Sequence, residues 1–260
     1  MKKSIIILVV FGASTEKTKK SLVLIENLCR QRFPHSEISW AYTSKAIRAR
    51  LLERKIKVHS PKQAVEHYAA QGHKRILIQS LQVIPGIEFE ELSEGLNEMQ
   101  ETYPECELLL GRPLLGEESD LHQVSELLLK EQSPKLHTTD HLIYIGHGSP
   151  HRNSKYYHQL GQILAQKNPK VQVATLESSP SYEDVLRNLS QLDSGKKVIL
   201  HPLMSLAGYH TTKDIAGNDD SSWVSRLETQ GYNVQPIQKG LLEYESFCQL
   251  WLDHAQDALG

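Results

Sequence analysis

The sequence predicts an α/β fold of two lobes, each built on a parallel sheet flanked by helices. Short apolar runs alternate with longer amphipathic segments along the 260 residues, which is typical of βαβ units. The order of these segments in the second half repeats their order in the first half, which indicates an internal duplication. The length also exceeds the roughly 150 residues of an average domain. We therefore expect two similar Rossmann-like lobes related by a pseudo-twofold axis.

The predicted core strands are short apolar runs rich in β-branched residues. They cover residues 5–11, 37–41, 76–80, 108–110, 142–145, 171–176, 198–202 and 233–236. The first run follows two lysines, as in a signal peptide, but it is short and ends in a glycine turn rather than at a small-residue cleavage site. We interpret it as a buried first strand.

The predicted helices are the amphipathic segments between these strands. They cover residues 15–32, 61–71, 89–103, 121–132, 156–166, 182–191 and 222–230. Pro134 and a polar cluster interrupt the pattern at residues 133–139, so we place the first lobe at residues 1–136 and the second at residues 137–260. The last segment, residues 243–258, is amphipathic and could pack back on the first lobe.

The two halves can be aligned on their strand-and-turn segments. Residues 6–12 match residues 142–148, and residues 78–88 match residues 200–210. The residue matches are weak, but strand, glycine turn, helix, strand, long loop and helix recur in one order. In this alignment Glu88 is the first-half counterpart of His210.

Composition narrows the function classes. The chain is 39% hydrophobic and 23% charged, as in an ordinary globular protein, and its net charge of −2 gives no basic field for nucleic acid. The three cysteines lie far apart without a CxxC pair, which favours a reducing compartment. No apolar stretch approaches the roughly 18 residues of a membrane span. We expect a cytoplasmic protein. The sequence does not determine the oligomeric state, and a homo-oligomer is one of the possibilities.

Three side chains able to bind a metal follow predicted strands of the second lobe. They are His147, Glu177 and His210, and ligands collect at the carboxyl ends of strands in open α/β sheets. Two imidazoles and a carboxylate suit Co2+, Fe2+, Ni2+ or Zn2+ and leave coordination positions open. Either histidine could instead act as a base near neutral pH.

A single histidine among 13 is more often a surface or core residue than a ligand. His147 is the exception because it lies between Gly146 and Gly148. We interpret these glycines as allowing close backbone approach by a bulky ligand, with no contribution to packing. The joint placement of the three residues favours a site.

Six segments resemble the anaerobic sirohydrochlorin cobaltochelatases and occur in that family's order. They are FGAS (11–14), AYTSKAIRARL (41–51), IQSLQVIPGIEFEEL (78–92), GHGSPH (146–151), LESSP (176–180) and HPLMSLAGYHTTKDIAGNDDSSW (201–223). The resemblance implies a class II chelatase fold, similar to protoporphyrin ferrochelatase, with the tetrapyrrole between two lobes. It also implies that His147, Glu177 and His210 coordinate the incoming metal, that His147 accepts protons, and that Glu88 is an acidic catalytic residue facing the substrate.

Sirohydrochlorin is a polycarboxylate, so its site should offer cations and hydrogen-bond donors. Arg48 belongs to a basic run after the AYTS segment and is our candidate partner for a carboxylate. The alternative for this run is an exposed basic helix face. Ser14, Thr43 and Ser44 could donate hydrogen bonds to the substrate or cap helices.

The sequence lacks the G-x-x-x-x-G-K-[ST] motif, and no G-x-G-x-x-G follows the first strand. We therefore expect neither ATP nor another nucleotide. The function that the resemblance implies is insertion of Co2+ into sirohydrochlorin in early, anaerobic cobalamin biosynthesis. The alternatives are a sirohydrochlorin ferrochelatase for sirohaem, a non-catalytic carrier of tetrapyrrole or metal, and hydrolysis of a phosphate ester, which rests on the GHG turn alone.

Overall fold

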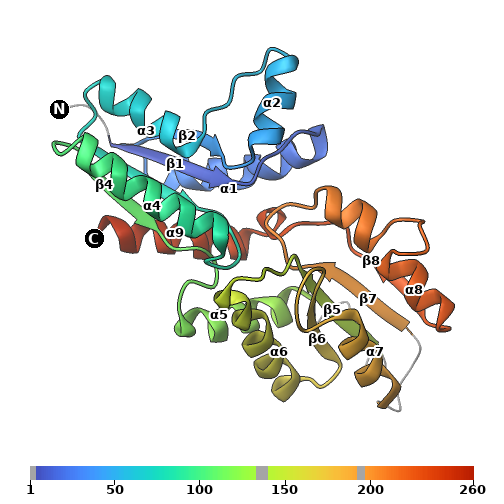
Figure 1. The fold of residues 1–260 in the computed structure, drawn as a ribbon. Helices are drawn as coiled ribbons and strands as arrows, with labels where there is room; N and C mark the ends of the chain where they lie inside the picture. Colours follow the sequence, from blue (N-terminus) through green and yellow to red (C-terminus); the bar gives the residue numbers. More distant parts are fainter. Residues whose placement is uncertain (1–3, 133–139, 192–196) are drawn as a thin grey trace. The chain divides into compact units, whose positions relative to one another are not determined.

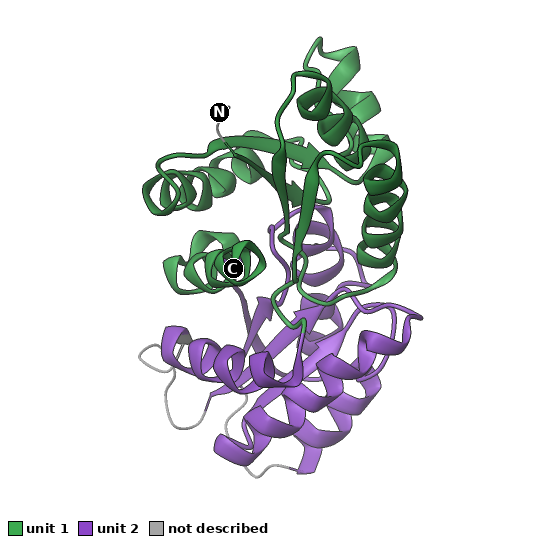
Figure 2. Ribbon diagram, turned by 90° about the vertical axis from the view of Figure 1, so that its left-hand side faces the viewer, with its two compact units in different colours: residues 1–116, 242–260 green, residues 117–241 purple. Residues whose placement is uncertain are grey.

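The computed structural model describes residues 4–132, 140–191 and 197–260. The chain divides into two compact units: unit 1 contains residues 1–116 and 242–260, and unit 2 contains residues 117–241 (Figure 2). The sequence suggested a single boundary between residues 136 and 137, whereas the structure divides at two points. The predicted linker, residues 133–139, lies outside the described residues.

Unit 1 is built on a parallel sheet with the strand order β2-β1-β3-β4. Its strands are β1 (Ile5–Val10), β2 (Glu37–Tyr42), β3 (Arg75–Ser80) and β4 (Glu107–Gly111). Every residue of β1 is buried, as expected for a parallel strand covered on both faces. The apolar run that resembled a signal peptide is therefore the central strand of this sheet.

Helices cover both faces of the unit 1 sheet (Figure 1). They are α1 (Glu16–Arg32), α2 (Lys45–Glu53), α3 (Pro61–Ala70), α4 (Ile87–Thr102) and α9 (Glu245–Leu259). Ile5, Ile7 and Val9 of β1 form one core cluster with apolar residues of α3 and α4. On the other face, α9 packs against α1, β3 and β4. α2 contributes only Leu51 to the core.

Unit 2 has the same construction, with the strand order β6-β5-β7-β8. Its strands are β5 (His141–Gly146), β6 (Val171–Thr175), β7 (Lys197–Pro202) and β8 (Asn233–Pro236). Its helices are α5 (Glu118–Gln132), α6 (Lys155–Lys167), α7 (Tyr182–Gln191) and α8 (Trp223–Thr229), with a short π-helical turn at Thr211–Ile215. Ile143 and Ile145 form a core cluster with residues of α7 and α8, and α6 packs against β6 and α5.

The register of the sheets confirms the internal duplication. Ile7 of β1 pairs with Ile78 of β3, and Ile143 of β5 pairs with Leu200 of β7. The sequence alignment had already matched Ile7 with Ile143 and Ile78 with Leu200. The predicted fold class, two lobes with parallel sheets flanked by helices, is therefore confirmed down to individual strand pairs.

The last helix of each half packs in the other half's unit. α5 follows β4 of unit 1 in the chain but packs on α6 in unit 2, and α9 follows β8 of unit 2 but packs on α1 in unit 1. The indole of Trp251 in α9 is fully buried and donates from Nε1 to the Gln82 carbonyl at 3.3 Å. The two halves thus exchange helices reciprocally.

Most predicted elements end within a few residues of the observed bounds, and the strand at Asn233–Pro236 and the helix at Tyr182–Gln191 coincide with them. Four elements of the described residues were missed: α2, the π-helical turn at Thr211–Ile215, and the short 3-10 helices at Arg152–Ser154 and Leu241–Glu243. No helix in the three described stretches of the chain is long and apolar enough to cross a bilayer.

Candidate active site

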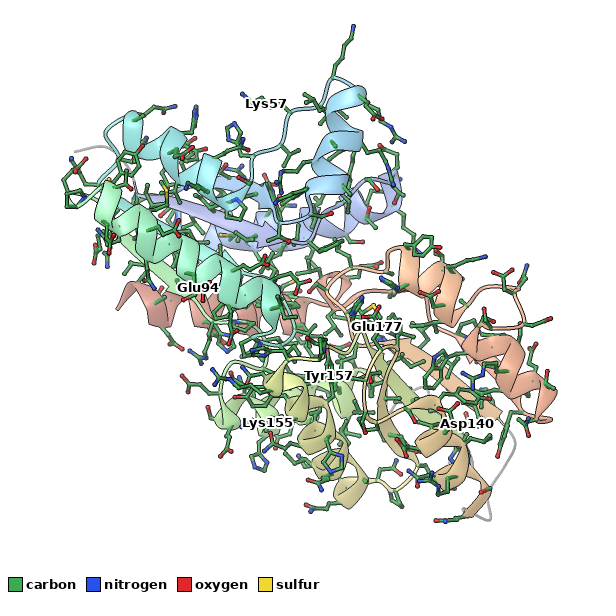
Figure 3. The ribbon with its side chains drawn as sticks, in the orientation of Figure 1. Lys57, Glu94, Asp140, Lys155, Tyr157 and Glu177 are labelled. Atoms are coloured by element: carbon green, nitrogen blue, oxygen red, sulfur yellow. The ribbon has the colours of Figure 1, made fainter. Side chains whose placement is uncertain are left out.

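The backbone beyond β5 and β6 holds His147 and Glu177 side by side. The parallel ladder continues past the strands, because Leu176 N donates to Gly146 O and Glu177 N donates to His147 O, both at 3.0 Å. His147 Nδ1 lies 3.6 Å from Glu177 Oε2, and Figure 3 labels Glu177 at the end of β6. Strand pairing therefore brings together two residues that are thirty positions apart in the chain.

The loop after β7 brings His210 to the same edge of the sheet. Leu203 N donates to Ile145 O at 2.8 Å, which extends the β5–β7 pairing beyond the strands. His210 directly precedes the π-helical turn, a local distortion that is frequent at functional sites. Its ring centroid lies 4.6 Å from that of His147, with the ring planes at 87°. All three predicted ligands thus lie at one edge of unit 2.

Both imidazoles direct the Nδ1 atom at a group that can only accept a hydrogen bond. His147 Nδ1 lies 3.0 Å from the Gly148 carbonyl, and His210 Nδ1 lies 2.6 Å from Asp214 Oδ2. Each Nδ1 is therefore the hydrogen-bond donor, and in the neutral tautomer with this arrangement the lone pair is on Nε2. Metal-binding histidines in proteins show this arrangement, with one nitrogen on the metal and the other donating to a carbonyl or carboxylate.

The distance between the two ring centroids is compatible with a shared ion, but the orientation of the rings is not. With a metal–nitrogen bond of about 2.1 Å and a ring radius of about 1.1 Å, two imidazoles at a right angle on one ion have centroids about 4.5 Å apart. The observed separation is 4.6 Å. The rings meet edge to face, however, and among the described residues no group of three His, Cys, Asp or Glu side chains converges on one point. Ion binding would require the side chains to rotate.

The three side chains are accessible to an incoming ion. The exposed fraction of the side chain is 44% for His147, 54% for Glu177 and 38% for His210. A core histidine or a structural carboxylate would be covered on most sides. The arrangement is therefore an open group of donors, as expected for a metal that arrives and leaves.

The glycines beside His147 have a different role from the one predicted. A Cβ atom on Gly146 would lie 2.3 Å from the Tyr157 ring, and one on Gly148 would lie 2.7 Å from Ser178 Oγ. Gly148 also has φ +84°, a backbone conformation that glycine adopts more readily than residues with a Cβ atom. The prediction that these glycines contribute nothing to packing was wrong. They let a tyrosine and a serine pack directly against the turn that carries His147.

The carboxyl edge of the unit 1 sheet has the same backbone as the edge in unit 2. Ser44 N donates to Phe11 O at 3.0 Å, which matches the bond from Glu177 to His147. Gly86 N donates to Ile84 O at 2.9 Å, and Gly208 N donates to Leu206 O at 3.0 Å. With the sheet register, these bonds give three equivalent pairs of positions. They are Phe11 and His147, Ser44 and Glu177, and Glu88 and His210.

The predicted substrate-binding residues of unit 1 have mixed surroundings. Ser44 caps α2 and accepts from Ile47 N, which is the capping alternative. Arg48 donates to the Tyr42 and Thr43 carbonyls, and burial lowers the pKa of its guanidinium. Arg48 thus braces the loop between β2 and α2.

The remaining three substrate candidates differ in exposure. The Thr43 hydroxyl is buried and has no hydrogen-bond partner among the described residues. The Ser14 carbonyl accepts from Arg54 Nη1 at 3.3 Å. Glu88 is exposed in the first turn of α4, so it is the acidic candidate that a ligand in solution could reach.

Asp214 is the functional candidate that sequence reasoning missed. Its carboxylate accepts from His210 Nδ1 and thereby fixes which nitrogen of that ring keeps a lone pair. The signal was present, because Asp214 follows His210 by four residues, the spacing that puts two side chains on one helical face.

The chain is similar to known proteins along its whole length. The sequence profile of a family described as cobalt chelatase (CbiK) matches residues 3–260. The chain belongs to the cobalt chelatase family. It is 32% identical over 259 residues to the sirohydrochlorin cobaltochelatase CbiKC of Nitratidesulfovibrio vulgaris, covering all of this chain and 92% of the relative. It is 31% identical over 262 residues to the sirohydrochlorin cobaltochelatase of Salmonella typhimurium, covering 97% of that relative.

Solved structures place this cobalt chelatase family member in the same fold as other chelatases. SirB from Bacillus subtilis, solved with Fe3+, has a TM-score of 0.68 at 14% identity, covering 98% of this chain and 95% of SirB. CbiX, described as the terminal enzyme of siroheme biosynthesis in denitrifying bacteria, has a TM-score of 0.59 at 14% identity, covering 99% and 100%. The family indicated by the six segments is confirmed, and so is the chelatase-like fold that the resemblance implied.

Proposed function

We propose that this chain inserts Co2+ into sirohydrochlorin, and that His147, Glu177 and His210 carry the ion before insertion. The observation that carries the proposal is the meeting of these three side chains at one edge of unit 2. The two relatives that match the whole chain are both named sirohydrochlorin cobaltochelatases, which supports the choice of metal and tetrapyrrole.

The donor set fits an ion that is a substrate and not a permanent part of the protein. Imidazole and carboxylate bind Co2+, Fe2+, Ni2+ and Zn2+ with graded affinity, and three protein ligands leave positions open for the nitrogens of a macrocycle. The Nε2 lone pairs of His147 and His210 and the oxygens of Glu177 would bind the ion. The macrocycle nitrogens then replace them one at a time.

Charge balance requires that two pyrrole protons leave as one divalent ion enters. Transfer of the ion away from His147 frees its Nε2 lone pair, and an imidazole accepts a proton near neutral pH. His147 can therefore act first as a ligand and then as a base. Glu88 is an exposed carboxylate of unit 1, and we assign it as an acidic group that faces the substrate and takes up the second proton.

Binding supplies the driving force in this proposal, without ATP. The sequence holds no phosphate-binding loop motif. Rate enhancement would come from holding ion and macrocycle in a reactive arrangement and from binding the distorted macrocycle more tightly than the relaxed one. The three cysteines are buried thiols, and we place the reaction in the reducing cytoplasm.

The decisive experiment compares histidine variants in the metallation of sirohydrochlorin by Co2+, followed by absorbance without oxygen. We expect His147→Ala and His210→Ala to lose insertion, by roughly a thousandfold or more, and to bind Co2+ more weakly. His158→Ala is the matched control, because His158 is exposed on α6, and it should retain the wild-type rate. Wild-type turnover in either site variant would refute the assigned roles.

The same assay separates the alternative functions. A carrier would bind Co2+ and sirohydrochlorin without forming metallated product in excess of protein. A ferrochelatase for sirohaem would show a higher kcat/KM with Fe2+ than with Co2+. We expect product in excess of protein and the higher kcat/KM with Co2+.

A further inference from the structure

Six large apolar side chains are exposed among the residues that the structure describes. They are Phe11, Val23, Leu52, Ile56, Ile87 and Tyr209, with exposed fractions between 39% and 69%. Single exposed apolar residues are common on protein surfaces and need no explanation. The position of three of them does need one, because Phe11, Ile87 and Tyr209 lie at the carboxyl edges of the two sheets.

Ile87 and Tyr209 occupy equivalent positions in the two units. Glu90 N donates to Gly86 O at 3.0 Å, and Thr212 N donates to Gly208 O at 3.2 Å, so the chain turns in the same way around both. Each residue directly precedes a candidate site residue, Glu88 in unit 1 and His210 in unit 2. The ring of Tyr209 lies 5.7 Å from that of His210.

Phe11 takes the place of a metal ligand in unit 1. It is equivalent to His147, and its side chain is 56% exposed. In unit 2 the rings of His147 and His210 lie 4.6 Å apart, and the equivalent backbone positions in unit 1 are those of Phe11 and Glu88. Unit 1 therefore carries an apolar ring and a carboxylate where unit 2 carries two imidazoles.

The substrate proposed above matches this composition. A tetrapyrrole is a broad, flat apolar ring with ionised groups at its rim, and burying apolar area drives such binding. Contact with the apolar ring calls for side chains that do not bind the metal. Phenylalanine and isoleucine provide contact area without a donor atom.

We propose that Phe11 and Ile87 form a contact surface for the macrocycle on unit 1, one that packs against the ring and does not bind the metal. This inference rests on the proposed function. It adds two substrate-binding residues that neither metal-ligand chemistry nor hydrogen-bonding capacity would identify.

The test separates tetrapyrrole binding from metal binding. The affinity for metal-free sirohydrochlorin is measured by fluorescence titration, and the affinity for Co2+ alone is measured by calorimetry. We expect Phe11→Ala to raise the Kd for sirohydrochlorin roughly ten- to hundredfold and Ile87→Ala to raise it roughly tenfold. Both variants should leave the Kd for Co2+ unchanged.

Val23→Ala is the matched control, because Val23 is 54% exposed on α1 of the same unit, and its Kd for sirohydrochlorin should equal that of the wild type. Phe11→Tyr keeps the ring and should restore most of the affinity. Wild-type sirohydrochlorin affinity in both alanine variants would overturn the inference and leave the proposed function standing. A wild-type chain that neither binds nor metallates sirohydrochlorin would instead overturn the proposed function.

Discussion

The carboxyl edges of the two sheets share a backbone and differ in chemistry. The same ladder bonds position Phe11, Ser44 and Glu88 in unit 1 and His147, Glu177 and His210 in unit 2. A duplicated backbone thus supplies two equivalent sets of positions, and only one set carries two imidazoles. The comparison teaches that one backbone can carry two different sets of side chains, and that the proposed metal binding depends on those side chains and not on the backbone.

The most severe test of this equivalence transfers the ligands from unit 2 to unit 1. We expect the combined variant Phe11→His, Ser44→Glu and Glu88→His to bind a second Co2+, so that calorimetry gives two ions per chain where the wild type gives one. Adding His147→Ala and His210→Ala should remove the Co2+ bound at unit 2 and keep the Co2+ bound at the new site in unit 1.

Ser44 caps α2, and removing this cap should lower the free energy of unfolding by roughly 1 kcal/mol. The double variant Phe11→His and Glu88→His keeps the cap and is the control for this loss. A folded triple variant that binds no additional ion would show that equivalent backbones do not give equivalent side-chain geometry.

The second prediction concerns the group that orients His210. Asp214 follows His210 by four residues, whereas the residue four positions after Glu88 in unit 1 is Leu92, which is buried in the core. We expect Asp214→Asn to weaken Co2+ affinity roughly 10- to 100-fold, because the ring loses the partner that fixes its orientation. The melting temperature should change little, since the Asp214 side chain is 40% exposed. Unchanged Co2+ affinity would mean that the 2.6 Å contact has no effect on binding.

The third prediction concerns the turn that carries His147. Gly146 corresponds to Val10 in unit 1, and in unit 2 the Tyr157 ring occupies the space that a side chain at this position would need. We expect Gly146→Ala to lower the free energy of unfolding by roughly 1–3 kcal/mol through overpacking. The cost should be smaller in a Tyr157→Leu background, which a double-mutant cycle by urea denaturation would measure. An equal cost in both backgrounds would exclude the ring as the cause.

The smallest expected effect lies at the end of α2. Lys55 N donates to Leu52 O and Ile56 N donates to Leu51 O, the same pair of bonds that ends α8 at Gly231. Lys55 has φ +61° and Gly231 has φ +85°. We expect Lys55→Gly to raise the free energy of unfolding by about 0.5–1 kcal/mol.

The reverse change, Gly231→Lys, should lower the free energy of unfolding by a similar amount. Chemical denaturation of both variants would check the pair. A destabilised Lys55→Gly variant would indicate that the lysine side chain makes a contact worth more than the backbone strain.

Much of the fold was predictable because both sheets are buried on both faces. A run such as residues 5–10 must be apolar at every position, and polar helices and glycine turns separate the runs clearly. α2 escaped prediction because only Leu51 of its nine residues is buried, so no apolar stripe marks it. The unit boundaries were not predictable from local sequence, because nothing in residues 118–132 specifies which unit α5 will cover.

The placement of the three candidate ligands at one edge of unit 2 was predictable, and their side-chain geometry was not. The strands preceding His147, Glu177 and His210 could be read from the sequence, and parallel pairing then brings the three residues to one edge. The contact between His210 and Asp214 depends on side-chain rotation, which no pattern of residue types fixes. The role of Gly146 depends on Tyr157, eleven residues further along the chain and in another element.

The reciprocal exchange of α5 and α9 has a consequence for biogenesis. α9 is synthesised after the whole of unit 2, yet it covers one face of the unit 1 sheet, which is synthesised first, and Trp251 and Phe247 of α9 are buried there. The apolar surface of that first sheet therefore stays uncovered until translation has passed through unit 2 and reached α9. The order of synthesis and the order of completion therefore cannot coincide in this protein.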